Sequence, residues 1–268
     1  MNWLNLFENN TIELKHQFGR DINATISKDE EVLFDKSAKA FEEKNIIDAY
    51  EYFFKSLENF SFSKSNKNII TSREVNKLNF TIYQGTACIK GFVTLENFLA
   101  EVKITKKANA HVALKRYLLE RNYQLTYACY FADDEYIKLK LYFDNLTMSP
   151  QKIFFPIREI ALNADFDKEY MKTEFPNTIL EDIEHLQEVP IEELKIKYDF
   201  LQKWIKELED KISLLPSNDA IGMQSFLYLS VLLQIDYLIV PNYEIYQKTA
   251  KKIQNYFNDE NSSMEVNN

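Results

Sequence analysis

The sequence predicts an α+β protein, in which an antiparallel sheet carries helices on one face and helical regions flank it at both ends. Changes in the spacing of apolar residues support this prediction. Before about residue 75 and after about residue 175, apolar residues recur every three or four positions, which is typical of amphipathic helices. Between these points they alternate with polar residues, as in half-buried strands, and two helical stretches interrupt the alternation. We therefore divide the chain into an N-terminal helical region (1–75), an α+β core (76–175) and a C-terminal helical region (176–268).

The N-terminal region predicts a helix–turn–helix. Its apolar face consists of Phe34, Ala38, Phe41, Ile46, Ala49, Tyr50, Phe53 and Leu57. No second copy follows at a period near 34 residues, which argues against a tetratricopeptide array. Small polar residues at 61–68 end the pattern.

The core begins with strands. Residues 97–105 alternate between apolar and polar side chains, and residues 78–95 read as two more strands joined by a turn at Gln84-Gly85. Helical spacing returns at 109–122, where we expect Asn109 to cap the start of a helix and Asn122 to end it in the left-handed conformation.

A hairpin follows, with strands at 124–131 and 136–143 around an acidic turn. Its second strand directs four side chains to one face: Tyr136, Lys138, Lys140 and Tyr142. Tyrosine rings and lysine stems make good contact surfaces, so this face is our candidate protein-binding site. The alternative is that it is simply the solvated side of the sheet.

A long helix is expected from Ser149-Pro150 to about Met171, with Pro156 either kinking it or delaying its start. Asp165, Asp167 and Glu169 have the spacing that begins a calcium loop, but no glycine follows them. We expect these three acids to form a solvent-exposed helix face.

The C-terminal region contains the most regular pattern in the chain. From 191 to 215 apolar residues follow a heptad spacing between Pro190 and Pro216. The central members of this seam are Leu194, Tyr198, Leu201, Ile205, Leu208 and Ile212. The seam packs either on a later helix of the same chain or on a second chain. The last eleven residues, 258–268, are polar and are expected to be disordered.

Few residues are of the types that catalytic motifs need. The chain has 4 glycines, whereas average usage of ~7% predicts about 19. They are too widely spaced for a phosphate-binding loop, and the 3 histidines and 2 cysteines are equally scattered. His111 has no potential ligand at suitable spacing. We therefore assign no catalytic residue, no metal ligand and no cofactor.

The net charge of −9 and the pI of 5.1 argue against nucleic-acid binding, which needs a basic surface. The charge is uneven, because residues 101–122 hold 6 basic and 2 acidic residues whereas residues 181–210 hold 4 and 10. These regions either attract each other or are ordinary solvated faces.

The N-terminus lacks the apolar segment of a secretory signal, so we expect a cytoplasmic protein in which Cys88 and Cys129 are reduced and buried. Residues 221–240 form a membrane-like stretch, but Asp236 costs ~2.5–3.5 kcal/mol inside a membrane. We expect a buried core helix there, and no membrane association.

Several features occur together in the core: a helix end leading into a long strand, an acidic hairpin turn, an alternating second strand, a Leu-Thr-x-Ser-Pro helix start and Ala-Asp at 164–165. The segment that contains them, LLERNYQLTYACYFADDEYIKLKLYFDNLTMSPQKIFFPIREIALNADFDKEYM (118–171), resembles the YbjN family of bacterial sensory-transduction regulators. That family shares its fold with type III secretion chaperones. The resemblance implies a non-enzymatic protein that binds other polypeptides along sheet and helix surfaces, often as a homodimer.

We therefore expect a non-enzymatic, cytoplasmic protein-binding module, chaperone-like or regulator-like, whose partner is another protein or a second copy of itself. Binding would rest on apolar and aromatic patches with a polar rim. The alternative is a small-molecule sensor or enzyme with a site between the core and the C-terminal helices. A third interpretation is a scaffold that dimerises through residues 191–215.

Overall fold

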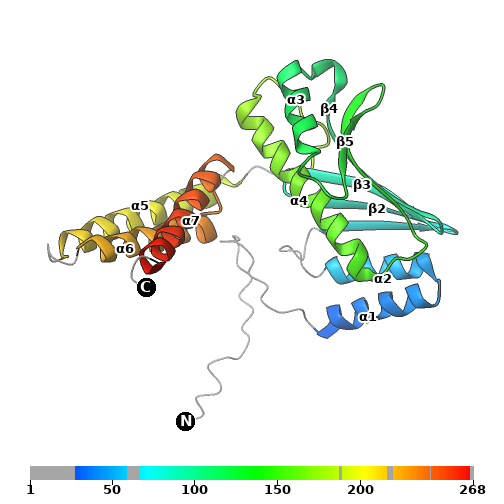
Figure 1. Ribbon diagram of the computed structural model, residues 1–268, viewed down its shortest axis with the longest axis horizontal. Coiled ribbons are helices and arrows are strands. Elements are labelled where there is room, and N and C mark those ends of the chain that lie inside the picture. The colour runs from blue at the N-terminus through cyan, green and yellow to red at the C-terminus, as the bar shows by residue number, and fades with distance from the viewer. Residues whose placement is uncertain (1–27, 59–66, 187–188, 216–219, 242, 266–268) are drawn as a thin grey trace, which may run out of the picture. The chain divides into compact units, whose positions relative to one another are not determined.

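The computed structural model describes residues 28–58, 67–186, 189–215, 220–241 and 243–265 (Figure 1). The chain forms two compact units, one from Asp21 to Gln187 and one that contains the helices after Glu188. The first is the α+β unit and the second is the C-terminal helical unit. The predicted α+β fold with flanking helices is confirmed.

The α+β unit is built on a six-stranded antiparallel sheet. Its strands are β1 (Ile69–Glu74), β2 (Lys77–Gln84), β3 (Ala87–Thr94), β4 (Asn97–Lys106), β5 (Cys129–Ala132) and β6 (Tyr136–Asp144). Their order in the sheet is β1-β2-β3-β4-β6-β5. Helix α3 (Val112–Arg121) connects β4 to β5. The return through the hairpin then places β6 beside β4 and leaves β5 at the edge.

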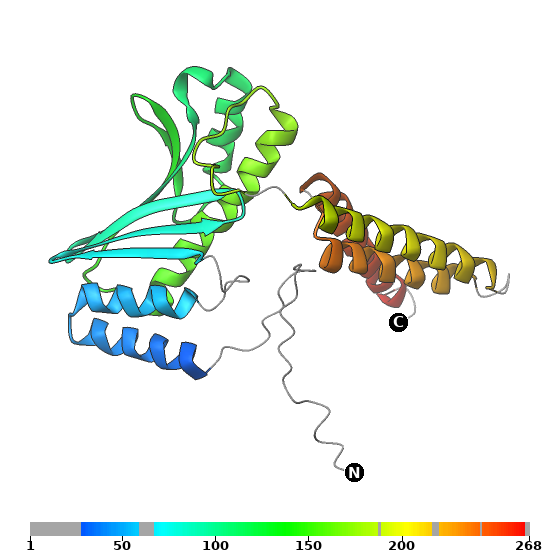
Figure 2. The ribbon, with the colours of Figure 1, turned by 180° about the vertical axis from the view of Figure 1, so that it is seen from behind.

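One face of this sheet is covered by helices. Alternate residues of β2, β4 and β6 are buried and pack against α2 (Ile46–Glu58) and α4 (Pro150–Glu174). Helix α1 (Lys28–Glu42) stacks on α2, and Figure 2 shows the two helices below strands β1–β3. Aromatic rings fill the contact, with Tyr50, Phe80 and Phe143 all within 5.6 Å of the Phe98 ring centre. The predicted segregation of helices to one face follows from this alternation.

No boundary between compact units lies at residue 75, where we predicted one between the N-terminal helical region and the core. The predicted helix–turn–helix is present as α1 and α2, but both pack on the sheet and belong to the α+β unit. Strand β1, inside the region expected to be helical, was not predicted. Only its first residue, Ile69, is buried, so this edge strand carries no alternating pattern for the sequence to reveal. The polar stretch 61–68 lies largely outside the described residues.

The turns around α3 differ from the predicted ones. His111, and not Asn109, caps the helix, and its Nδ1 accepts the N–H of Leu114 at 3.2 Å. Asn122 ends α3 in a right-handed conformation, with φ −59°. Its side chain instead bonds to the backbone of Tyr130, which accounts for an asparagine at this place.

Strand β5 is shorter than the predicted 124–131, because a carboxylate replaces a neighbouring strand as the hydrogen-bond acceptor. The oxygens of Glu159 accept the N–H groups of residues 126–128 at 2.7–2.9 Å. Cys129 is the first residue of β5 and points to the face opposite the buried Tyr130. It is exposed, so the prediction that it is buried is wrong. Cys88 is buried as predicted, and both thiols are free.

The start of α4 is as predicted. Ser149 Oγ accepts the N–H of Lys152 at 3.4 Å, and Pro150 is the first helical residue. Pro156 lies inside the helix and is buried. The sequence left open whether Pro156 delays the helix, and the helix begins before it.

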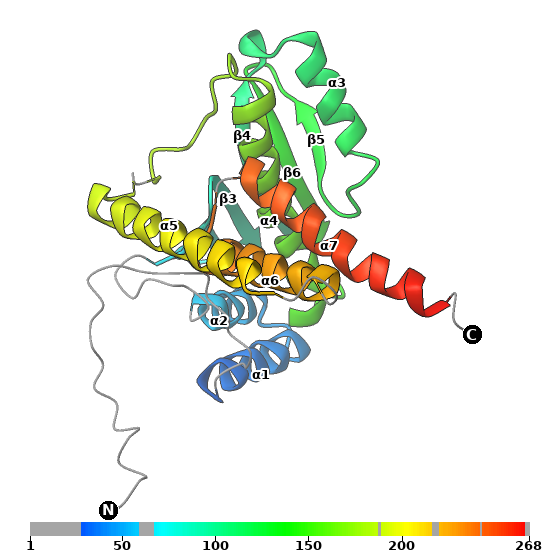
Figure 3. The ribbon, with the colours of Figure 1, turned by 90° about the vertical axis from the view of Figure 1, so that its left-hand side faces the viewer.

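The C-terminal helical unit consists of α5 (Ile191–Ser213), α6 (Ala220–Gln234), a π-helical turn (Ile235–Ile239) and α7 (Tyr243–Glu265), and Figure 3 shows α5 alongside α6. Among its described side chains only Leu229 and Thr249 are buried. The expected disordered tail is partly wrong, because α7 extends to Glu265; residues 266–268 lie outside the described chain.

The predicted seam on α5 divides into two sets. Leu201, Leu208 and Ile212 are half-buried. The other three are exposed: Leu194 by 51%, Tyr198 by 60% and Ile205 by 38%. Leu208 lines a small cavity together with Leu227 and Val231 of α6. Part of the seam therefore packs within the chain, and part of it has no cover within this unit.

The apolar helix of this unit is not the buried core helix that we expected. Among the described residues, Gly222–Ile239 is a helix long and apolar enough to cross a membrane, with a mean hydropathy of 1.2, and 6% of it is buried. The expectation fails because α5 and α7 cover little of its surface within the unit.

A buried lysine fixes the end of α4. The side chain of Lys168 is fully buried, and its Nζ donates to the carbonyl oxygens of Thr86 at 3.4 Å and Glu181 at 2.6 Å. Burial lowers its pKa to about 8, although the nearby charges of Asp182 and Glu184 oppose this shift. Lys168 thus joins α4 to the start of β3 and to the segment that follows the helix.

Lys168 makes the stability of the fold depend on pH. Its pKa in the folded state, about 8, lies below the value of ~10.4 for an unfolded chain, so the unfolded state binds more protons between these values. The contribution of Lys168 to the free energy of unfolding therefore rises with pH from about 8 to ~10.4. Lys168→Met should remove this rise. Its cost in free energy of unfolding, about 1–3 kcal/mol for each carbonyl left unpaired when Lys168 is neutral, should therefore grow with pH across this interval. Urea unfolding of both proteins at several pH values between 7.5 and 9.5 measures the difference.

Cys88 is present in both proteins, and burial raises its pKa. Above the pKa that Cys88 has in the unfolded chain, it makes the free energy of unfolding fall with pH, which is the opposite of the Lys168 effect. Because the Lys168 charge lowers the pKa of Cys88, the two proteins are compared in a Cys88→Ala background, which removes this contribution from both. An equal rise in both proteins would contradict the assignment to Lys168.

Candidate protein-binding surface

The face of the sheet opposite α2 and α4 carries the four residues predicted as a binding site. Tyr136, Lys138 and Lys140 are half-buried, and Tyr142 is 58% exposed. They alternate along β6 with the buried Ile137, Leu139 and Leu141, as the sequence predicts. The structure therefore brings all four to one face. The second predicted set, the α5 seam, lies in the other unit.

Lysines and aromatic rings are interleaved across this face. The Lys103 Nζ lies 4.3 Å from the ring centre of Tyr136, and the Lys140 Nζ lies 5.4 Å from that of Phe131 and 5.8 Å from that of Tyr142. Such exposed contacts contribute about 0.5–1 kcal/mol each. They hold the rings and lysine stems in an ordered, flat surface.

The lysines of this face have different surroundings. Lys138 forms ion pairs with Asp133 at 2.8 Å and Glu101 at 3.1 Å, and its hydrogen bond lowers the pKa of Asp133. Within the described residues, neither Lys103 nor Lys140 lies within 4 Å of a carboxylate. Lys138 therefore stabilises the hairpin, and Lys140 and Lys103 are available to a binding partner.

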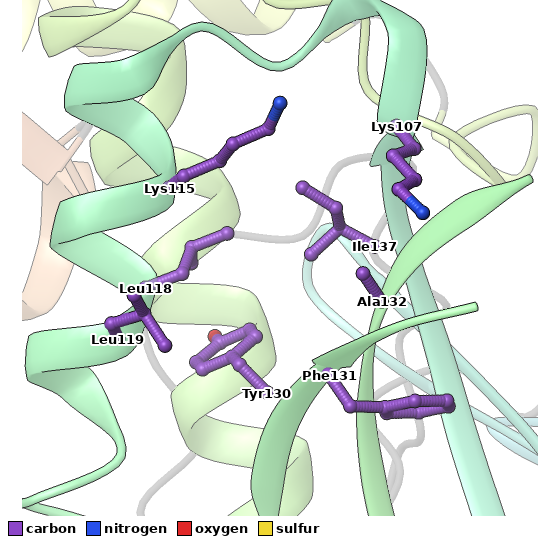
Figure 4. Close-up of a pocket in the computed structure, with 8 residues that line it drawn as sticks. All are labelled: Lys107, Lys115, Leu118, Leu119, Tyr130, Phe131, Ala132 and Ile137. Atoms are coloured by element: carbon purple, nitrogen blue, oxygen red, sulfur yellow. The ribbon is translucent and has the colours of Figure 1, made fainter. Parts of the chain in front are cut away.

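A groove lies beyond the edge of the sheet, between α3 and the β5–β6 hairpin (Figure 4). Its volume is about 310 Å³. The lining is Lys107, Lys115, Leu118, Leu119, Tyr130, Phe131, Ala132 and Ile137. Figure 4 shows Lys115 on α3 and Lys107 on the opposite side, with apolar side chains between them. No sequence motif indicated this groove, because its residues come from separate segments.

A buried ionic cluster supports one wall of the groove. Asp167 is fully buried, and its carboxylate accepts hydrogen bonds from the hydroxyls of Tyr117 and Tyr130, both at 2.5 Å, and from Arg121 Nε at 2.8 Å. Burial raises the pKa of both tyrosines, and the Asp167 charge adds to this effect, so both remain protonated donors at neutral pH. Arg121 also donates to Asn163 at 2.7 Å. The Tyr130 ring lines the groove, so the cluster fixes the position of that wall.

The prediction that Asp165 and Asp167 lie on a solvated face is wrong. Asp167 follows the buried Ile160 and Ala164 and precedes the buried Met171 at helical spacing, a signal that the sequence contained. Asp165 is half-buried and accepts the N–H and hydroxyl of Thr86 at 2.7 and 2.9 Å. Glu169 is half-buried and pairs with Lys172 at 2.7 Å on the outer side of the helix.

The groove and the open face consist mainly of apolar, aromatic and lysine side chains. The groove lining contains no carboxylate, histidine, serine or cysteine. Within the described residues, no three side chains of the metal-binding types lie together. Asp167, the one deeply buried acid near the groove, is surrounded by its own hydrogen-bond donors and holds structure.

No protein-family model matches the chain, and no curated protein matches it in sequence. Functional inference therefore rests on the geometry of the described residues.

Removing the charge of Asp167 should destabilise the α+β unit strongly. Asp167→Asn leaves the Arg121 guanidinium, 12% exposed, without its counter-charge, and breaking one partner of a buried ion pair costs about 3–5 kcal/mol. The matched control, Glu169→Gln, lies on the same helix and loses only a surface pair, worth about 0–1 kcal/mol. Urea denaturation measures both free energies. Equal effects of the two substitutions would contradict a structural role for the cluster.

Proposed function

We propose that this chain is a non-enzymatic, cytoplasmic protein-binding module of the chaperone or regulator type. The observation that carries the proposal is the open sheet face, which no helix of the α+β unit covers. It presents ordered aromatic rings together with Lys103 and Lys140, which have no carboxylate within 4 Å among the described residues. Surfaces of this composition suit polypeptide partners, because aromatic groups supply contact area and lysine stems add apolar contact below a charged tip.

The layout of residues 118–171 is consistent with the resemblance to the YbjN and secretion-chaperone families. The end of α3 leads into β5, the acidic turn closes the β5–β6 hairpin, and α4 begins at Ser149-Pro150. We include membership of that family in the proposal. It implies that an extended segment of a client protein is held on the sheet and helix surfaces.

The alternative class is a small-molecule sensor or enzyme. The groove beside α3 is large enough for a small ligand, but its lining offers no carboxylate, histidine or nucleophilic hydroxyl or thiol. The composition of the groove therefore favours binding over catalysis.

Reversing one charge of the open face should weaken partner binding. Lys140 contacts two rings and lies away from carboxylates, so Lys140→Glu changes the surface without removing a described ion pair. We expect a protein partner captured at a stoichiometric ratio by the tagged full chain to be reduced at least about tenfold by this substitution. Lys36→Glu on α1 is the matched control, because Lys36 is exposed and has no ion pair among the described residues, and it should leave capture unchanged. Equal capture by all three proteins would count against the sheet face as the binding surface.

A second function, self-association through the C-terminal helical unit, is favoured by a separate observation. Exposed apolar side chains occur on all three helices, including Tyr198 and Ile205 of α5, Phe226 of α6 and Phe257 of α7. Large apolar side chains left exposed in this number favour an interaction site on the unit. We propose that a second copy of the chain covers the exposed part of the α5 seam.

The two halves of the seam allow this idea to be tested. The double substitution Tyr198→Asp with Ile205→Asp changes exposed positions, so it should convert a dimer into a folded monomer. Leu201→Asp with Leu208→Asp places charges at half-buried positions and should unfold the helical unit instead. Light scattering after size exclusion gives the mass, and circular dichroism gives the helix content. A wild-type protein that is monomeric at all accessible concentrations would contradict self-association.

A further inference from the structure

The outer edge of β5 is closed by side chains at two points and open at a third. Asp133 donates its N–H to Tyr136 across the hairpin at 3.0 Å, so by alternation the backbone groups of residues 128, 130 and 132 point away from β6. The outward N–H of Ala128 is bound by Glu159, and Asn122 binds both backbone groups of Tyr130. Ala132 lines the groove, and its outward N–H and C=O have no hydrogen bond within the described residues.

The rim of the groove is basic. Lys107 and Lys115 are exposed and face each other across it, and neither is within 4 Å of a carboxylate in the described part of the chain (Figure 4). Lys107 Nζ donates to the carbonyl oxygen of Asp133 at 3.3 Å, which holds it at the mouth. In a chain of net charge −9, this segment from 101 to 122 has 6 basic and 2 acidic residues. The rim therefore complements a partner that carries carboxylates.

The floor of the groove is apolar and ordered. Leu118, Tyr130 and Ile137 are buried, and Leu119, 63% exposed, extends the apolar wall to the mouth. The bond from Tyr130 to Asp167 holds the ring in place. A preformed apolar floor lowers the entropy lost when a side chain enters it.

We propose that this groove binds an extended polypeptide segment in which an apolar side chain lies beside carboxylates. The apolar side chain contacts Leu118 and Tyr130, the segment's backbone pairs with Ala132, and its carboxylates meet Lys107 and Lys115. A fatty acid fits the same floor and the same lysines, but it has no amide groups for Ala132, so the geometry favours a peptide. This inference rests on the proposed protein-binding function and names its site and the chemistry of its partner.

Fluorescence anisotropy with the full chain tests the proposal. The probe is a fluorescein-labelled peptide, Glu-Leu-Asp-Phe-Glu-Leu-Asp, and a version with lysine in place of each acid is the negative control. We expect the acidic peptide to bind, the basic one not to bind, and the affinity for the acidic one to fall at least about tenfold in Lys107→Gln/Lys115→Gln and in Leu119→Asp.

Matched control variants change the same residue types on other surfaces. Lys36→Gln/Lys39→Gln removes two exposed charges from α1, and Leu146→Asp alters a side chain that is 86% exposed in the loop after β6. Both should bind the peptide as the wild type does. Circular dichroism of every variant confirms that lost binding is not lost folding, and Leu119→Asp is chosen because its exposed position tolerates a charge.

The results that would overturn the groove proposal differ from those that would overturn the proposed protein-binding function. If Lys140→Glu abolishes peptide binding and the groove variants do not, the peptide occupies the open sheet face, and the groove proposal is overturned while protein binding stands. If labelled decanoate binds in a groove-dependent manner and the peptide does not, the groove is a small-molecule site and the proposal is overturned. If no probe binds, the groove proposal fails, whereas partner capture by the full chain still decides the proposed function.

Discussion

A single buried carboxylate determines how the β5 edge of the sheet is joined to helices α3 and α4. Asp167 is fully buried, and a charge in that position is tolerated only where hydrogen bonds and a counter-charge surround it. Arg121 and Tyr117 come from α3 and Tyr130 comes from β5, so neutralising Asp167 requires both elements to dock against α4. The groove between α3 and β5 is the surface that this docking creates.

The same region shows how an edge strand is protected from uncontrolled pairing. Unpaired strand edges invite association with other chains, and short strands or covering groups prevent it. Here Glu159 binds the outward N–H of Ala128, Asn122 binds both outward backbone groups of Tyr130, and β5 has four residues. Within β5 as described, Ala132 leaves both its outward backbone groups open, and it does so inside a groove with lysines at the rim. The edge is therefore closed to general strand addition and accessible to a segment that also satisfies the groove.

The sequence allows the sheet and its orientation to be predicted because β2, β4 and β6 each bury every second residue. Strand β1 escapes prediction because it buries one residue, and β5 is shortened by Glu159, a residue about thirty positions away. The candidate binding face of β6 is predictable, since alternation places Tyr136 and Tyr142 on one side of the strand. The Asp167 cluster and the groove combine residues from α3, β5, β6 and α4, and no local pattern joins them. On α5 the heptad spacing identifies apolar positions, but spacing alone does not show which of them a partner helix covers.

The central claim is that the α3 and β5–β6 end of the α+β unit is where this chain binds polypeptides. Amide hydrogen exchange of the full chain, free and bound to its captured partner, tests it most directly, because exchange reports protection along the whole backbone. The claim predicts slower exchange in residues 112–121 and 129–142 on binding, with Ala132 among the protected amides. Protection confined to α5–α7, with unchanged exchange in these two segments, would contradict it.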